Sequence, residues 1–179
     1  LRLAIETRKD QIEAFDWELV PEDETADAEA LAGQIAAGYA VLKKPDGVTP
    51  WAQWLRMLLE ELLVIDAVCI HPRLSRGGGL YGLELIDGAT IKRLIDDGGR
   101  MPLPPDPAYQ QILKGLPAVG YTADQIVYLM RNPRVSRLYG YSPVEQVITT
   151  VNIALRRQHT QLSHYTEGTA PDALAQVPD

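Results

Sequence analysis

Six aspartates in the middle of the chain have the greatest capacity for acid–base or metal chemistry: Asp66, Asp87, Asp96, Asp97, Asp106 and Asp124. Paired carboxylates can exchange protons or hold a divalent cation. Three of the six, in Asp87-Gly88 and Asp96-Asp97-Gly98, fit turn chemistry first. Asp66 differs because it interrupts the apolar run 62–70, where strand alternation would point it to solvent. One hypothesis is a small enzyme domain that uses Asp66 with a loop carboxylate.

The other reactive residue types form no recognisable catalytic pattern. The glycine-rich segment 77–82 lacks the Lys-Ser/Thr pair and following helix of a phosphate loop, so we expect a hairpin tip. His159 and His164 are five residues apart with no acid between them, and His71 is remote, which does not fit a zinc helix. Cys69, the only cysteine, lies in an apolar run and is expected to be buried and inert. We predict no catalytic residue, no metal and no cofactor.

Acidic residues are concentrated at the start of the chain. The net charge is −7, and residues 1–30 carry ten acids against three bases, whereas the other 149 residues hold 14 of each sign. A protein that grips DNA usually has a basic surplus, so we expect any passing DNA to be contacted only non-specifically. No apolar run approaches the roughly 18 residues of a membrane helix, which predicts no membrane partner.

The hydrophobic pattern predicts helices first, strands second and one long helix last. Helices are expected at 1–17, 26–42 and 51–63, the third capped by Thr49 with Pro50 in its first turn. Its predicted buried face is Trp51, Trp54, Leu55, Leu58, Leu59 and Leu62. Strands are expected at 17–20, 64–72, 80–86, 90–95, 109–113 and 126–130.

This order favours an α+β fold in which N-terminal helices pack on a small, mostly antiparallel sheet, followed by a long C-terminal helix. We treat 1–179 as one unit, mainly helical over 1–63, strand-rich over 64–132 and helical again over 142–165. The start without Met and the end without a closing element favour an internal fragment of a longer protein.

The last helix has a clear start signal, Ser142-Pro143-Val144-Glu145. Ser142 is expected to accept a free N–H of the first turn, Pro143 needs no donor there, and Glu145 can return a hydrogen bond to complete a capping box. Apolar residues then recur every three or four positions, which predicts a buried side of Val144, Val147, Ile148, Val151, Leu155 and Leu162.

Three arginines, Arg131, Arg134 and Arg137, recur at every third position before this helix. Three roles are open: a solvated loop, an intersubunit ion-pair surface that faces the acidic N-terminal helices of a neighbour, and direct contact with phosphate.

Three parts of the chain, which follow one another as 8–17, 83–92 and 138–171, resemble the portal proteins of tailed bacteriophages in their sequence and their order. The strongest is 139–145, Tyr-Gly-Tyr-Ser-Pro-Val-Glu, which is similar to the family's Tyr-Gly-x-Ser-Pro-x-Glu element before a long helix; 165–171 then resembles its segment with Gly and Pro. Segment 83–92 is similar to the family's leucine-rich strand followed by Asp/Pro-Gly-x-x-Ile/Val. Segment 8–12 with Trp17 resembles a helix that ends before a tryptophan.

The resemblance implies a non-enzymatic structural subunit, with this chain as part of the α+β wing. The family forms a ring, typically of twelve copies, at the capsid vertex of a phage or prophage virion, assembled in the host cytoplasm. The ring conducts double-stranded DNA during packaging and ejection. Its partners are the terminase, capsid and tail adaptor proteins, which we expect to bind partly through regions outside this chain. Another head–tail adaptor remains an alternative, as does the small enzyme domain.

Overall fold

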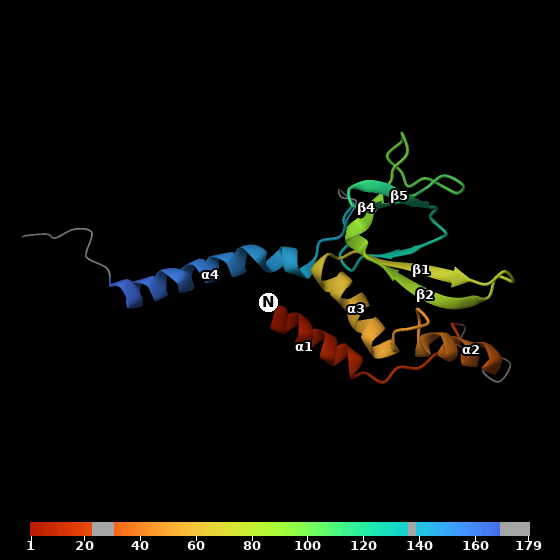
Figure 1. The fold of residues 1–179 in the computed structure, drawn as a ribbon, viewed down its shortest axis with the longest axis horizontal. Helices are drawn as coiled ribbons and strands as arrows, with labels where there is room; N and C mark the ends of the chain where they lie inside the picture. Colours follow the sequence, from red (N-terminus) through yellow and green to blue (C-terminus); the bar gives the residue numbers. More distant parts are fainter. Residues whose placement is uncertain (23–30, 136–138, 169–179) are drawn as a thin grey trace, which may run out of the picture.

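The computed structural model describes residues 1–22, 31–135 and 139–168, and the predicted α+β fold is confirmed (Figure 1). Three helices come first: α1 (Arg2–Glu13), α2 (Ala32–Lys43) and α3 (Trp51–Val64). The predicted start of the second helix, at residue 26, lies outside the described residues. The chain then forms strands β1 to β6 and ends in α4 (Pro143–Glu167), which extends away from the body (Figure 1).

The strands form two small antiparallel sheets rather than the single sheet we predicted. One has the order β2-β1-β6, from β2 (Leu80–Ile86), β1 (Val68–Leu74) and β6 (Val127–Leu129). The other has the order β3-β4-β5, from β3 (Ile91–Arg93), β4 (Tyr109–Leu113) and β5 (Leu116–Tyr121). The core joins the two sheets and contains Cys69, Ile86, Ile91, Ala108, Tyr109 and Ile126.

Strand β5 was absent from the sequence prediction. Its Pro117 and Gly120 are poor strand formers, and Gly115 before it indicates a turn. Lys114 and Gly115 both have positive φ, 52° and 79°, and they connect β4 to β5 as a two-residue hairpin loop. The tight turn therefore sets the pairing of β5 with β4, although the residues of β5 have weak strand propensity.

The segment 17–20 is not the strand we predicted. Trp17 instead packs on Tyr39 of α2 and Trp51 of α3, with ring centroids 5.8 and 4.8 Å away. The Leu19 N–H donates to the Tyr39 hydroxyl at 3.0 Å. These contacts hold the segment on α2 and α3, and it pairs with no strand of the described residues.

The N-cap of helix α3 lies one residue later than predicted. Its N-cap is Pro50, which has no side-chain acceptor, so the Thr49 cap was wrong. The Asp46 carboxylate accepts the Val48 and Thr49 N–H groups at 2.8 and 2.6 Å and holds the preceding turn. The helix buries Trp54, Leu59 and Leu63; the rest of the predicted face is half-buried.

The free edge of β2 is covered at its centre. The Leu83 N–H donates to the Pro45 carbonyl at 2.5 Å, and the Trp54 indole N–H donates to the Leu83 carbonyl at 3.0 Å. Both outward backbone groups of Leu83 are therefore satisfied by the turn before α3 and by α3 itself.

Strands β1 and β3 are shorter at their starts than predicted. Helix α3 continues to Val64, and β1 begins only at Val68, because Asp66 has φ 55°. This left-handed conformation departs from the extended backbone of a strand, and Asp tolerates it better than most residues. Before β3, Asp87 caps a short 3-10 turn, η1 (Gly88–Thr90), by accepting the Ala89 N–H at 2.9 Å.

Candidate functional site

The residues with catalytic potential do not gather into a reactive centre. Among the described residues, no three His, Cys, Asp or Glu side chains are close enough to hold a metal ion. Asp96 holds a turn by accepting the Arg100 N–H at 2.8 Å. Cys69 is fully buried, and burial raises its thiol pKa to about 12. Nor does any helix in the described ranges have the length and apolar character needed to cross a membrane.

Asp66 is fully buried, so the prediction that it points to solvent was wrong. Its two carboxylate oxygens accept the Arg131 and Asn132 backbone N–H groups at 2.5 and 2.9 Å. These donors lie directly after β6, 65 and 66 residues along the chain. A carboxylate already bonded to two backbone donors is suited to holding a loop in place and poorly suited to proton transfer.

Two glycines press on the backbone around Asp66. A Cβ at Gly140 would lie 2.1 Å from an Asp66 carboxylate oxygen, and a Cβ at Gly88 would lie 1.8 Å from the Ala67 carbonyl oxygen. We call Asp66, Ala67, Gly88 and Gly140 the Asp66 corner. Here α3, η1, β6 and the approach to α4 meet, and only hydrogen atoms fit at the two glycine positions.

The segment between β6 and α4 is closed at its base. The Tyr141 N–H donates to the Asn132 carbonyl at 3.0 Å, and the Asn132 amide donates to the Tyr141 carbonyl at 3.1 Å. Ser142 then caps α4, its Oγ accepting the Glu145 N–H at 2.9 Å, with Pro143 in the first turn. Among the described residues Glu145 does not bond back to Ser142; its carboxylate lies 4.0 Å from the Arg134 guanidinium.

The three predicted interface arginines have different environments. Arg134 is used within the chain: its guanidinium lies 4.5 Å from the Tyr141 ring centroid and donates to the Gly140 carbonyl at 3.3 Å. Arg131 is exposed, and Arg137 lies outside the described residues. Spacing by three does not align the first two on one face, because the segment is a loop.

Helix α1 is held on α3 mainly by charged groups. The Arg56 guanidinium of α3 contacts Glu6, Asp10 and Glu13 of α1 at 2.7, 2.6 and 2.8 Å. Lys9 of α1 is buried and pairs with Glu60 of α3. We call this group the α1–α3 charge cluster. Glu6, Asp10 and Glu13, three of the six acids in residues 1–22, are therefore neutralised within the chain.

Within the α1–α3 charge cluster, Glu60 is the acid whose pKa is shifted by its partners. Burial alone would raise the pKa of its carboxyl, but the hydrogen bonds from Lys9 and Arg2 outweigh burial and hold the pKa below its usual value. The cluster is therefore most favourable when Glu60 is ionised.

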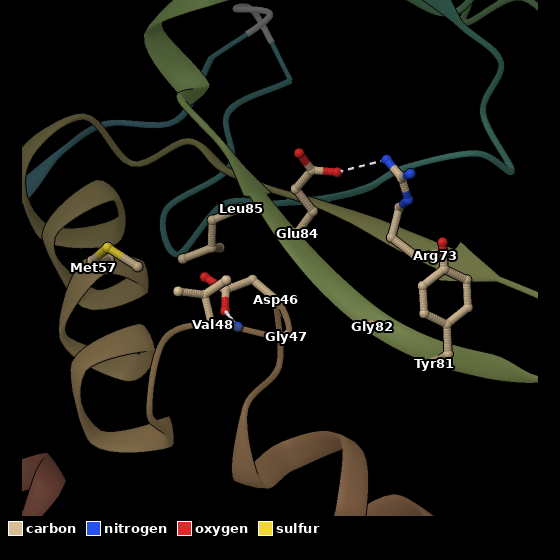
Figure 2. A pocket seen from close by; sticks show the side chains of 9 residues that line it. All are labelled: Asp46, Gly47, Val48, Met57, Arg73, Tyr81, Gly82, Glu84 and Leu85. Carbon is tan, nitrogen blue, oxygen red and sulfur yellow. Dashed lines mark hydrogen bonds and ion pairs between the residues drawn. The ribbon is translucent and has the colours of Figure 1, made fainter.

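A hollow of about 530 Å³ lies between the turn before α3 and strand β2 (Figure 2). Its polar side chains are already paired: Arg73 donates to Glu84 at 2.9 Å, and Asp46 accepts from its own turn (Figure 2). Val48, Met57 and Leu85 form its apolar side. It offers neither a free acid–base pair nor a nucleophile, so we do not assign catalysis to it.

The predicted buried side of α4 is largely uncovered. The base of α4 lies beside the body, where α4 packs on α3, and the rest of the helix extends away from it (Figure 1). Val147 is 39% exposed, Leu155 57% and Leu162 62%, so exposure increases along the helix. The predicted residues do lie on one face of α4. The prediction that this face is buried was wrong for Val147, Leu155 and Leu162.

No protein-family model and no curated protein matches this chain. Solved structures do share its fold. A chain in the neck of an empty gene transfer agent (GTA) particle, computed with C6 symmetry, has a TM-score of 0.65 and 14% identity, covering 93% of this chain and 44% of its own length. A chain in the neck of the native GTA particle, computed with C12 symmetry, has a TM-score of 0.58 and 13% identity, covering 73% and 36%.

A chain in the virion of the native gene transfer agent particle is similar to this chain as well. Its TM-score is 0.57 at 12% identity, with 92% of this chain and 52% of that chain covered. This chain thus spans about half, or less, of the length of the structures it matches. At such identities the likeness establishes a shared fold.

Proposed function

We propose that this chain belongs to a structural subunit of the connector between head and tail in a tailed phage, a prophage or a phage-like particle. The observation that carries the proposal is the fold likeness to a neck chain over 93% of this chain. The order of the portal-like segments supports the same conclusion independently, since it was read from residue types alone.

Within the connector, we propose the portal ring at the capsid vertex as the specific role. The chain would supply part of the wing of each subunit, and about a dozen copies would surround the DNA path, in keeping with the C12 symmetry used for one neck structure. The terminase, capsid and tail adaptor proteins would bind mainly through other parts of the subunit. Assembly would take place in the host cytoplasm.

The subunit is proposed to act without catalysis. The enzyme hypothesis depended on Asp66, which is buried and bonded to two backbone N–H groups. DNA would pass without tight binding, because the body outside the acidic start has equal numbers of acids and bases. Arg131 remains a candidate for contact with a neighbouring subunit, since it is exposed beside the approach to α4.

Native mass spectrometry and negative-stain imaging of the complete protein test this proposal. Closed rings with a central hole are the expected result. A monomer or dimer at every salt concentration would contradict it. Incorporation of the rings into capsid shells on co-expression with the capsid protein would distinguish a portal from another neck adaptor, which would remain outside the shells.

A further inference from the structure

One face of α4 carries an apolar strip that the described residues leave largely exposed. Its residues lie on one side of the helix, and polar Gln158 and His159 occupy that side between Leu155 and Leu162. We call them the α4 stripe: Val147, Ile148, Val151, Leu155, Leu162 and Tyr165. Exposure reaches 84% at Tyr165, near the end of the helix that lies farthest from the body (Figure 1). An apolar strip of this length on a projecting helix normally marks an interaction surface.

The α4 stripe continues an interface that already exists. At its base α4 packs on α3, and Val144 and Val151 are half-buried there. Beyond that point the same face continues outward with the same residue types and no covering element. A partner that extends the α3 packing along the helix would complete the burial.

The flanks of α4 carry positive charge. Residues 146–166 contain Arg156 and Arg157 and no acid, and neither arginine makes an ion pair within the described residues. At the start of the chain, the exposed acids Asp16, Glu18 and Glu22 make no ion pair within the described residues, and we call them the acidic N-terminal region. The outer part of α4 extends clear of the body that bears α1, so these opposite charges do not pair within one copy (Figure 1).

We propose that the α4 stripe packs against a second copy of this chain, with the arginines of α4 facing the acidic N-terminal region of that neighbour. This proposal rests on the proposed ring function and specifies the surface through which the ring closes. Head-to-tail contact between two different patches of one subunit is what a closed ring requires. The stripe and the acidic N-terminal region are two such patches.

A matched pair of substitutions on α4 tests the proposal. Leu155 lies in the stripe and Ile153 lies on the opposite face, and their exposures are 57% and 55%. Leu155→Glu and Ile153→Glu therefore add the same charge at equally exposed positions two residues apart. Because both sites face solvent in the single chain, both variants should fold and keep the wild-type circular dichroism spectrum.

Native mass spectrometry of the complete protein gives the readout. We expect at least a tenfold loss of rings for Leu155→Glu and a much smaller loss for Ile153→Glu, which adds its charge one turn from Arg156 and Arg157. The double reversal Arg156→Glu and Arg157→Glu should reduce rings at low salt and much less at 1 M salt, where charges are screened.

The outcomes separate this inference from the proposed function. Wild-type rings that persist unchanged in Leu155→Glu would overturn the stripe as the interface while leaving the ring function intact. Equal loss in Leu155→Glu and Ile153→Glu would overturn it too, because the contact would then not be specific to one face. Wild-type protein without rings would overturn the ring function itself. Sedimentation with phosphatidylglycerol vesicles that Leu155→Glu abolishes, in the absence of any change in rings, would assign the stripe to a lipid surface instead.

Discussion

Replacing Asp66 should destabilise the protein more than replacing any other aspartate of the strand-rich region. The Asp66→Ala variant removes the acceptors of two buried backbone N–H groups, and hydrogen bonds to a charged group contribute about 1.5–3 kcal/mol each. The expected loss is therefore about 3–6 kcal/mol. Alanine in the left-handed conformation of this residue, at φ 55°, adds about 1 kcal/mol of strain. This is a large share of the roughly 5–15 kcal/mol of stability of an ordinary domain.

Asp66→Asn provides an intermediate. Asparagine tolerates positive φ and keeps one acceptor oxygen, so about 2–3 kcal/mol should be lost, corresponding to one bond. The control is Asp97→Ala, an exposed position where the change should stay within about 0.5 kcal/mol. Urea unfolding followed by circular dichroism gives the free energies, and hydrogen exchange reports on the two amides at 131 and 132.

The reasoning about Asp66 would be refuted by Asp66→Ala unfolding at the same urea concentration as Asp97→Ala. It would equally be refuted if the amides at 131 and 132 kept their protection. A variant more stable than the wild type would indicate a carboxylate held for chemistry and would revive the enzyme hypothesis.

Three further predictions concern other parts of the fold. Gly88→Ala should cost about 3 kcal/mol or more, because its Cβ would lie 1.8 Å from a backbone oxygen, whereas Gly33→Ala, in helix α2 with no atom within 4 Å, should gain about 0.5–1 kcal/mol in urea unfolding. Ser142→Ala should lower stability by about 1 kcal/mol through loss of the α4 cap, and Thr49→Ala should change it by less than about 0.5 kcal/mol; equal effects would contradict the cap assignments. The pKa of Glu60 is lowered in the folded state, so the unfolded chain binds its proton more readily; the stability from this residue is present above about pH 4.3 and is lost as the pH falls below that value. Hydrogen exchange should then increase in α1 before it increases in the sheets, and simultaneous exchange would contradict this.

Elements with strong local signals were predictable from the sequence. The start of α4 follows from Ser142 and Pro143, and the β1–β2 hairpin from its glycine-rich tip, because each signal depends on neighbouring residues. Strand β5 was missed because its register is set by a two-residue turn rather than by strand propensity. The role of Asp66 was missed because its partners are 65 and 66 residues away along the chain, and patterns of neighbouring residues cannot predict such a contact.

The same limit applies to the candidate site. Periodicity identified the apolar face of α4 correctly but cannot say whether one chain or its neighbour buries that face. The arginine spacing likewise could not show that Arg134 stacks on Tyr141, since a loop folded back on itself determines that contact.

The covered edge of β2 limits how copies of this protein can join. Pro45 supplies a carbonyl to Leu83 and has no N–H of its own to offer a further strand, while the Trp54 indole occupies the Leu83 carbonyl. An incoming strand therefore cannot add along β2 without first displacing this turn. Open-ended growth by sheet extension is blocked on this side. Association on this side is left to side-chain surfaces of fixed shape, whose geometry can set a finite copy number.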